Sequence, residues 1–363
     1  MKVRFVTSLT RGGPIEHTLY LARAMARQGI DVGAACAATS VAERFASAGI
    51  EARRIPLEHP LDASHARRIW RYTRGADVVH AQDRRSGLWV RLGPRPRKNG
   101  LRVYTVHGLP DQYLPPPVGP RHPGVRAYLA YRGLDAALCH RADAVIVPTQ
   151  AVARVLVERL RFPEAKLEII PGGVDPPAAV DRHRGAEVVG TLTTLEPVKG
   201  LDVFLRAAKR LAREHRRLRF VAFGAGSAAG ELHEVARRLG IDDRVEFPGQ
   251  VSKDRALGHL DVFVLSSYME NCPMALLEAM AAGVPAVSTV VGGVPEIATD
   301  GTVQLVEPGN DAALAAAIDR LLEDPDLRER QAASARDRVL ERFTAASSAR
   351  STLALYEELL EGG

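Results

Sequence analysis

Short apolar segments alternate with amphipathic segments along almost the whole chain, and this alternation restricts the fold more than any other feature. The apolar segments have the length of buried strands, and the segments between them carry apolar residues at helical spacing. Repeated strand–helix units predict parallel sheets that are covered by helices on both faces, with right-handed crossovers. We expect strands at 2–9, 30–35, 51–55, 76–81, 102–107, 144–147 and 166–170, and then at 188–192, 218–223, 245–247, 260–265, 284–288 and 304–306.

The alternation stops once, at residues 171–186 (PGGVDPPAAVDRHRGA), where glycines and prolines without periodicity predict a linker. We therefore predict an α/β chain with two doubly wound domains, at 1–171 and 187–343, a linker at 172–186 and a terminal helix within 344–363. Ligands of such sheets bind at the carboxyl ends of the strands, so the expected site is a cleft between the domains. Helices are expected at 15–28, 41–48, 64–73, 125–140, 151–160, 201–215, 231–239, 253–258, 274–282, 312–323, 327–343 and 345–360.

Composition excludes several classes of protein. Hydrophobic residues make up 46% and charged residues 25% of the 363 residues, as in an ordinary soluble globular protein. No stretch reaches the roughly 18 uninterrupted apolar residues of a membrane span, and the apolar run in MKVRFVTSLTRGG is too short for a signal peptide. Cys36, Cys139 and Cys272 are scattered without metal-ligand spacing, which favours a cytoplasmic location.

Positive charge is concentrated in the first half of the chain. Residues 1–178 contain 27 basic and 15 acidic residues, whereas residues 179–363 contain 22 and 28. The basic half favours an anionic partner, such as an acidic acceptor or an acidic membrane surface contacted from the cytoplasm. Arginines on solvated helix faces would give the same count. Nucleic acid is the weakest alternative, because the arginines are not interleaved with aromatic residues.

Residues 266–283 (SSYMENCPMALLEAMAAG) carry the main candidate site. Strong helix formers lie between Pro273 and Gly283, which suit the start and the end of a helix. Glu270 is then expected in a loop and Glu278 within the helix, with its side chain leaning back toward that loop. Free N–H groups at a helix start bind anions. This arrangement would suit a sugar, a diphosphate and a ribose, although one surface and one ordinary helical glutamate would give the same pattern.

Other candidates lie at the ends of expected strands. Gly12 and Gly13 follow the first strand and would let the backbone approach a ligand closely, but they do not complete a GxGxxG pattern. His107 ends a strand and could face a ligand or be an ordinary structural histidine. Lys199 lies in a turn before a helix, where it could contact a diphosphate or remain solvated.

Several further residues are weaker candidates for a functional site. Gly224 begins a glycine-rich turn after a strand, which suits a phosphate, a base or a plain tight turn. Residues 324–326 (DPD) formally match a DxD metal motif, but they lie between two expected helices, and we interpret them as a helix cap. The sequence therefore predicts no metal site. Residues that could line an acceptor site are His17, Asp83, Arg84 and Arg85.

In the order and position of these motifs, the chain resembles the retaining GT-B glycosyltransferases of family 4, which are also called the glycosyl transferases group 1. The resemblance covers nearly the whole chain and implies two Rossmann-like domains that face a central cleft, with the C-terminal helix returning to the N-terminal domain. It implies a bacterial enzyme of polysaccharide or glycolipid biosynthesis. The residues that carry it are Gly12-Gly13, His107-Gly108, IIPGGVD at 169–175, LEPVKG at 195–200, the E-x7-E of Glu270 and Glu278, VGGVPE at 291–296 and EPGN at 307–310.

The resemblance also implies roles for single residues. A nucleotide-sugar donor would be held mainly by the C-terminal domain and a glycan or glycolipid acceptor by the N-terminal one. Lys199 and the helix start would neutralise the leaving diphosphate in place of a metal ion, Glu270 would hold the sugar and Glu278 the ribose, and His107 would lie near the transferred sugar. The implied catalytic residues are His107, Lys199 and Glu270; the donor-binding residues are Gly12, Gly13, Thr194, Lys199, Gly224, Val251, Glu270, Asn271, Cys272, Pro273, Met274, Ala275, Leu276 and Glu278; and the acceptor-binding residues are His17, Asp83 and Arg84.

The chain departs from the family pattern at three places. Thr194 replaces an arginine that normally gives the diphosphate a second cationic contact, Gly172 replaces an asparagine, and Val303 replaces a glycine. Two alternatives to a transferase therefore stay open at this point. One is a nucleotide-sugar epimerase or a phosphorylase with the same two-domain plan, and the other is an inactive protein that binds a sugar nucleotide. The sequence does not specify the base, the sugar, the acceptor or the linkage.

Overall fold

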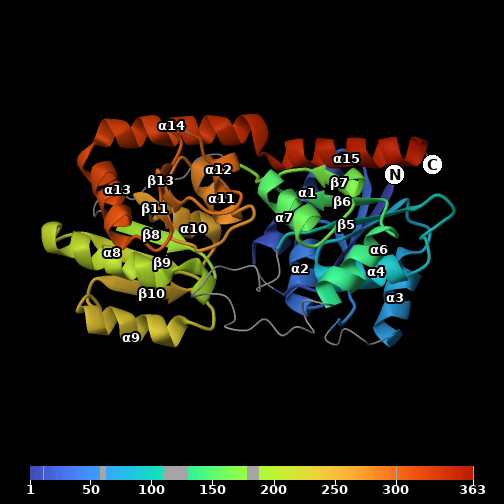
Figure 1. Cartoon of the computed structure of the whole chain (residues 1–363), viewed down its shortest axis with the longest axis horizontal. Helices are drawn as coiled ribbons and strands as arrows, with labels where there is room; N and C mark the ends of the chain where they lie inside the picture. Colours follow the sequence, from blue (N-terminus) through green and yellow to red (C-terminus); the bar gives the residue numbers. More distant parts are fainter. Residues whose placement is uncertain (11, 58–62, 109–129, 178–187, 300, 363) are drawn as a thin grey trace. The chain divides into compact units, whose positions relative to one another are not determined.

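The chain folds into two compact units (Figure 1). The computed structural model describes residues 1–10, 12–57, 63–108, 130–177, 188–299 and 301–362. Unit 1 contains the described residues of Met1–Gln112 and His122–Gly173 together with Thr344–Gly363, and unit 2 contains those of Val174–Phe343. None of the helices in the described ranges has the length and apolar character needed to cross a membrane.

Unit 1 is built on a sheet of seven parallel strands in the order β3-β2-β1-β4-β5-β6-β7. The central strands β1 and β4 are almost fully buried and consist mainly of apolar residues, as expected for strands covered on both faces. All seven strands predicted for this half of the chain are confirmed. The strands are β1 (Lys2–Thr7), β2 (Asp31–Cys36), β3 (Glu51–Arg54), β4 (Val78–Ala81), β5 (Leu101–Thr105), β6 (Ala144–Val147) and β7 (Leu167–Ile169).

The helices of unit 1 begin where the sequence supplies suitable starts. Gly12, at a φ of +100°, precedes α1, and Pro14 occupies its first turn. The Thr149 side chain accepts a hydrogen bond from Val152 N at the start of α7. The helices are α1 (Gly13–Arg27), α2 (Thr39–Ser47), α3 (Ala63–Thr73), α4 (Arg84–Leu92), the π-helix η2 (Ala130–Asp135), α6 (Ala136–Cys139), α7 (Gln150–Glu158), the short 3-10 turn η3 (Glu164–Lys166) and α15 (Ala345–Glu361).

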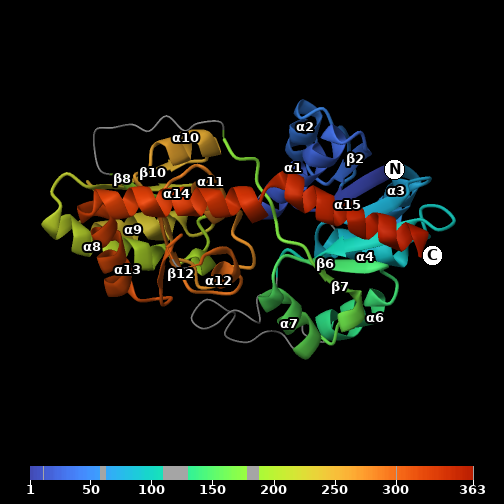
Figure 2. The same ribbon diagram turned by 90° about the horizontal axis from the view of Figure 1, so that it is seen from above.

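The last helix, α15, packs against α1 and completes unit 1 (Figure 2). Tyr356 on α15 is fully buried, and its hydroxyl lies 2.6 Å from Nδ1 of His80 on β4. Nε2 of His80 in turn lies 2.6 Å from the hydroxyl of Thr105 on β5. Every polar atom of this buried chain of contacts has a partner, which burial requires. The predicted return of the C-terminal helix to the N-terminal domain is therefore confirmed.

Unit 2 is built on six parallel strands in the order β10-β9-β8-β11-β12-β13. The core between this sheet and helices α8, α9 and α13 contains Phe204 and Phe220, whose rings meet edge to face with centroids 6.2 Å apart. Burial of one such side chain contributes about 1.5–3 kcal/mol. The strands are β8 (Val188–Leu192), β9 (Arg219–Phe223), β10 (Val245–Gly249), β11 (Val262–Leu265), β12 (Ala286–Thr289) and β13 (Gln304–Val306).

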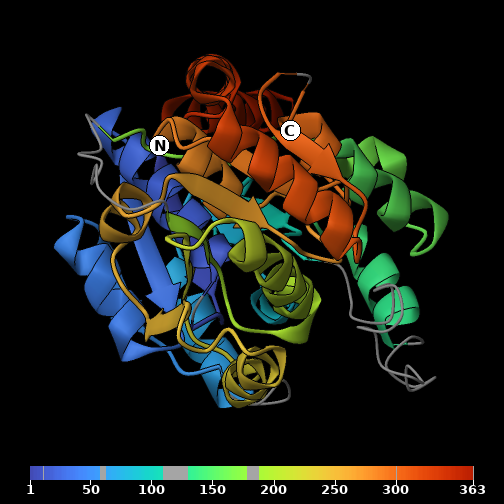
Figure 3. The same cartoon turned by 90° about the vertical axis from the view of Figure 1, so that its left-hand side faces the viewer.

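The helices of unit 2 cover both faces of its sheet (Figure 3). Helix α11 is apolar on nearly every side and packs against α14. The Asp324 side chain accepts a hydrogen bond from Leu327 N at 2.8 Å, so the DPD motif is the predicted helix cap. The helices are η4 (Pro197–Lys199, a 3-10 turn), α8 (Leu201–Glu214), α9 (Ala229–Leu239), α10 (Lys253–Gly258), α11 (Met274–Ala281), α12 (Val294–Ile297), α13 (Asp311–Glu323) and α14 (Pro325–Arg342).

Two segments of unit 1 differ from the sequence-based expectation. Helix α4 was not predicted, and the single helix expected at 125–140 is described only from residue 130, as the π-helix η2 followed by α6. The two segments meet at Asp135, whose carboxylate binds Nη2 of the buried Arg91 at 2.6 Å and Nε of Arg84 at 2.5 Å. This contact ties η2 to α4 over more than 40 residues of sequence, which local patterns do not report.

Candidate active site

The strand order of each sheet reverses once, and the loops at these two points carry most of the predicted site residues. The reversal lies between β1 and β4 in unit 1 and between β8 and β11 in unit 2. At such a point the neighbouring connections leave toward opposite faces of the sheet, and the space between their loops is where ligands bind. Each unit therefore offers one ligand-binding edge.

In unit 2, Lys199 and Glu270 form an ion pair at this edge. Lys199 ends the turn η4 after β8, and Glu270 lies in the loop after β11. Nζ of Lys199 lies 2.8 Å from Oε1 of Glu270, and the Ser267 hydroxyl donates to the same oxygen at 2.6 Å. The Glu270 side chain is 9% exposed and that of Lys199 21%, so the pair is mostly shielded from water while the lysine still reaches the surface. Two of the three predicted catalytic residues are thus in direct contact.

The loop that carries Glu270 is held by the segment that follows β12. Gly293 N donates to Glu270 O at 3.0 Å, and the Thr289 hydroxyl donates to Ser267 O at 2.6 Å. Gly292 has a φ of +50°, and a Cβ added there would lie 1.8 Å from Glu270 O. A larger residue would therefore displace the loop. The sequence singled out this VGGVPE segment only as a motif, and the structure shows that it fixes the backbone of Glu270.

Helix α11 begins directly after this loop. Pro273 is its N-cap, one position earlier than the first-turn position expected from sequence, and Leu276 N and Leu277 N both donate to Pro273 O. The N–H groups of Met274 and Ala275, which precede these two, have no earlier carbonyl of the helix to donate to, so the backbone at the start of α11 suits an anion. Glu278 lies one turn further along and is 7% exposed. The remaining predicted contacts of this stretch, Asn271, Cys272, Met274 and Ala275, all lie between Glu270 and the first turn of α11.

Three further predicted donor contacts lie at the same edge of the sheet. Thr194 follows β8, Gly224 follows β9 and Val251 follows β10. Gly224 has a φ of +135°, and a Cβ there would lie 1.8 Å from Thr193 O. Its N–H donates to Gly249 O at 2.8 Å. The glycine thus allows the loops after β8 and β9 to pack together, and its contact with a ligand stays a prediction.

In unit 1, the loops at the ligand-binding edge bring two histidines together. Gly12 and Gly13 lie after β1, His17 lies on α1, and His107 follows β5. The rings of His17 and His107 meet edge to face with centroids 4.9 Å apart. Nε2 of His107 lies 2.8 Å from Oε1 of Gln82, which follows β4. Gln82 was not among the predicted site residues, although its place directly after a strand, next to Asp83, was a usable signal.

These histidines are neutral at physiological pH. Burial lowers the pKa of His17 to about 4. Burial, with a smaller effect of the neighbouring His17, lowers the pKa of His80 to about 3. The pKa of His107 is also held well below its usual value, first by burial and then by the charges that His17 and His80 would carry. Hydrogen bonding in this cluster therefore involves neutral imidazoles, each with one N–H donor and one acceptor nitrogen.

Asp83, Arg84 and Arg85 each bind another group within unit 1. The Asp83 carboxylate caps α4 by accepting from Ser86 N at 3.0 Å, and it also accepts from the backbone and the hydroxyl of Ser8, both at 2.6 Å. Arg84 binds Asp135, and Nη1 of Arg85 donates to the carbonyl of Leu57 at 2.6 Å. These side chains have structural partners, and their assignment to acceptor binding stays a prediction.

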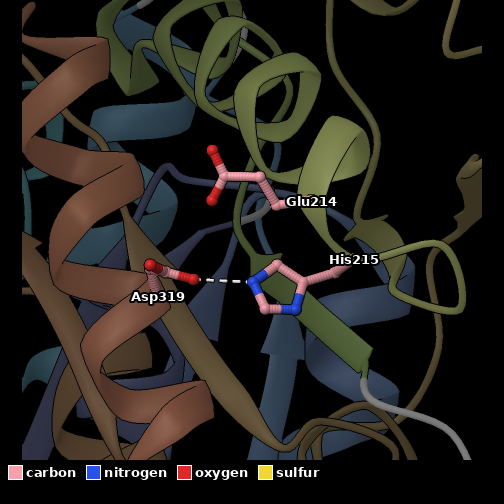
Figure 4. A group of neighbouring side chains, drawn as sticks. All are labelled: Glu214, His215 and Asp319. Carbon is pink, nitrogen blue, oxygen red and sulfur yellow. Dashed lines mark hydrogen bonds and ion pairs between the residues drawn. The ribbon is translucent and has the colours of Figure 1, made fainter.

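One group of potential metal ligands lies elsewhere in unit 2 (Figure 4). Glu214 ends α8, His215 follows it, and Asp319 lies on α13. Nε2 of His215 is 2.6 Å from Oδ1 of Asp319, and the His215 carbonyl accepts from Nη2 of Arg244 at 2.8 Å. Because α8 starts at the carboxyl edge of the sheet and runs back to the start of β9, this group lies at the opposite edge from Lys199 and Glu270.

Comparison with known protein families agrees with the motifs. The family model described as Glycosyltransferase Family 4 matches residues 11–177, and the model described as Glycosyl transferases group 1 matches residues 178–338. Together the two models account for most of the chain.

Individual relatives and solved structures also resemble this chain. A D-inositol 3-phosphate glycosyltransferase of Stackebrandtia nassauensis is 34% identical over 249 residues, which are 61% of this chain and 55% of that protein. A 2-deoxystreptamine glucosyltransferase of Streptomyces kanamyceticus is 28% identical, over 61% of this chain and 62% of that protein. The chain thus spans between half and two thirds of the length of these relatives. The crystal structure of Anabaena HepE in complex with UDP and glucose superposes with a TM-score of 0.83 at 19% identity, covering 99% of this chain and all of that one. This similarity shows the shared GT-B fold.

Proposed function

The chain belongs to the family 4 glycosyltransferases of the glycosyl transferases group 1, and from this premise we propose that it moves a sugar from a nucleotide diphosphate sugar to a glycan or glycolipid acceptor. The observation that carries the proposal is the contact between Lys199 and Glu270 beside the start of α11. A cation, a carboxylate and a helix start at one sheet edge match the leaving diphosphate and the sugar of such a donor.

In this proposal, different groups of unit 2 bind different parts of the donor. Lys199 and the first N–H groups of α11 bind the diphosphate and stabilise the negative charge that develops on it as the glycosidic bond breaks. Glu270 accepts hydrogen bonds from sugar hydroxyls, and Glu278 accepts them from the ribose. Because the lysine and the helix start supply the positive charge, the proposed transfer needs no metal ion. Retention of configuration is part of the proposal through family membership.

Lys199 and Glu270 must exchange partners when the donor binds. In the structure each neutralises the other at 2.8 Å. A diphosphate would draw Nζ of Lys199 toward its oxygens, and the sugar hydroxyls would replace the lysine at the carboxylate. The Glu270 carboxylate then keeps hydrogen-bond donors, the sugar hydroxyls and Ser267, in place of the lysine. The negative charge that the diphosphate brings is offset by Lys199 and the first N–H groups of α11.

UDP is the nucleotide that we propose for the donor, since HepE is described with UDP, glucose and UDP-glucose. We propose that the acceptor contacts unit 1 near His17 and His107, with His107 beside the transferred sugar. The acceptors in the names of the relatives, D-inositol 3-phosphate and 2-deoxystreptamine, are ring compounds that carry several polar groups. A cyclic polyol presented on a glycan or lipid fits the same class.

A panel of UDP, GDP, ADP and TDP in thermal unfolding tests the donor assignment. A ligand at a hundred times its dissociation constant stabilises the folded state by about 2.7 kcal/mol, and we expect this shift for UDP. Glu278→Ala should abolish it, because the ribose loses its acceptor. Glu234→Ala, which removes an exposed glutamate of α9, is the matched control and should retain it. Equal shifts for Glu278→Ala and the wild type would contradict the role of Glu278.

Thr194 favours a second candidate function, an inactive protein that binds a sugar nucleotide, because the family's second cationic contact is missing there. This candidate predicts the same thermal shift but no release of nucleotide diphosphate with any acceptor. The transferase predicts slow release with the donor alone and faster release with the right acceptor. Measuring UDP release across an acceptor panel separates the two.

We further propose that the protein is cytoplasmic and contacts an acidic membrane surface through α3. Arg67, Arg68 and Arg71 of this helix are all exposed, and each basic residue near such a surface contributes about 1 kcal/mol. Flotation with acidic liposomes should recover the wild type, whereas reversing the three arginines to glutamate should leave it in solution. Equal recovery with neutral liposomes would contradict an electrostatic contact.

A further inference from the structure

Gln82 lies at the centre of a buried polar cluster in unit 1. Its backbone N–H donates to Val6 O at 2.9 Å, which fixes the residue at the carboxyl end of β4. Its side chain is fully buried and extends between α1, which carries Thr18, and the loop that carries His107. The side chain can therefore contact only groups of the protein itself or a ligand that enters this edge of the sheet.

When the amide oxygen of Gln82 faces His107 and Thr18, the donors and acceptors of these groups do not match. Oε1 lies 2.8 Å from Nε2 of His107 and 3.2 Å from the Thr18 hydroxyl, while Nε2 of Gln82 has no partner among the described residues. The Thr18 hydroxyl also lies 2.7 Å from the carbonyl of Pro14, which can only accept. The single hydroxyl proton of Thr18 therefore goes to Pro14, and Thr18 offers Gln82 only a lone pair.

Turning the amide by 180° resolves this mismatch. The oxygen and nitrogen of a glutamine amide have nearly the same shape, and the hydrogen bonds decide which orientation is occupied. After the turn, the two amide protons point at two acceptors, the Thr18 oxygen and Nε2 of His107. Two N–H donors without a partner are then replaced by one oxygen without a partner, so the turned amide leaves fewer buried polar groups unsatisfied.

We propose that Gln82 is a positioning residue that donates a hydrogen bond to Nε2 of His107 and so holds this histidine in its Nδ1–H tautomer. The consequence for transfer rests on the proposed function: in this tautomer Nδ1 of His107 is a donor, so a substrate group that bonds to this nitrogen must offer an acceptor oxygen. The edge-to-face contact with His17 fixes the plane of the same ring. Gln82 thus sets which hydrogen bond His107 makes, without touching the substrate itself.

Nitrogen-15 NMR of the histidine rings tests the tautomer directly, because the two neutral tautomers have different ring-nitrogen shifts. The His107 signals can be assigned through their proximity to the His17 ring. We expect the wild type to show a protonated Nδ1 and an unprotonated Nε2 at His107. A protonated Nε2 in the wild type would overturn the proposal, and this measurement requires neither a variant nor an active enzyme.

Two variants separate positioning from structural support. Gln82→Glu replaces the donor by a group that only accepts, so the proton of His107 should move to Nε2; an unchanged tautomer would overturn the proposal.

Gln82→Met should lower kcat about tenfold, the equivalent of one hydrogen bond, with KM for the donor within about twofold. Gln331→Met is the matched control, since Gln331 is equally buried in unit 2 and donates to Ala286 O; it should leave both the tautomer and kcat unchanged. If the proposed reaction is wrong, the kinetic result fails while the tautomer result stands.

Discussion

Lys199→Met is expected to lower kcat/KM for sugar transfer by about 10²–10³-fold. The substitution keeps the length of the side chain but removes the positive charge that lies 2.8 Å from Glu270. Removal of one preorganised group that stabilises developing charge typically costs this much. Transfer would be measured as the initial rate of UDP release in the presence of acceptor. Because the charge acts mainly on the departing diphosphate, we expect most of the loss in kcat.

The same substitution should also destabilise unit 2, since it leaves the buried Glu270 carboxylate with Ser267 as its described partner. The double variant Lys199→Met/Glu270→Gln removes both charges and should recover stability without recovering activity. Lys209→Met, on the partly exposed face of α8, is the matched control and should retain full activity. If Lys199→Met transfers sugar at the wild-type rate, Lys199 is not the group that neutralises the leaving diphosphate.

The sequence was sufficient to predict the fold because its signals are local. Apolar runs and helical spacing in each βα unit need no information from distant residues, and the glycine and proline content of residues 171–186 separates the two series of units. The ion pair of the active site is different. Lys199 and Glu270 are 71 positions apart, and their contact depends on the strand order that places β8 beside β11. Motifs suggested both residues but could not show that they touch.

Helix α4 shows why some elements were missed. Its sequence, RRSGLWVRL, places an arginine where a core position would need an apolar residue. Arg91 is nevertheless fully buried, because Asp135 pairs with it and the Tyr104 ring lies under its guanidinium, 4.6 Å from centroid to Cζ. From the pattern of apolar residues alone, an arginine at this position is predicted to be exposed to solvent. Gln82 follows a strand, which marks it as a candidate, but its role depends on Thr18 and His107, which lie close to it only in the folded chain.

Unit 1 is expected to lose about 4 kcal/mol of unfolding free energy between pH 7 and pH 5 through His17 and His80. Their pKa values are lowered by burial to about 4 and about 3, from 6.5 in the unfolded chain. The unfolded state therefore binds protons that the folded state does not, so this stability is fully present above about pH 6.5 and is lost progressively as the pH falls toward the folded values. At pH 5 each histidine accounts for about 2 kcal/mol, and the lowered pKa of His107 acts in the same direction.

Urea unfolding followed by tryptophan fluorescence measures this loss in unit 1 alone, because Trp70 and Trp89 are the two tryptophans of the chain and both lie there. Carboxylates with lowered pKa values, such as Asp31, titrate below this range and do not contribute to it. His80→Gln should reduce the difference between pH 7 and pH 5, even though it lowers stability at both, because one buried titrating group is gone. His140→Gln, at an exposed position, should leave the difference unchanged. A wild-type stability that is the same at pH 5 and pH 7 would show that these histidines are not held neutral by burial, and it would remove the basis for treating His107 as a neutral hydrogen-bonding group.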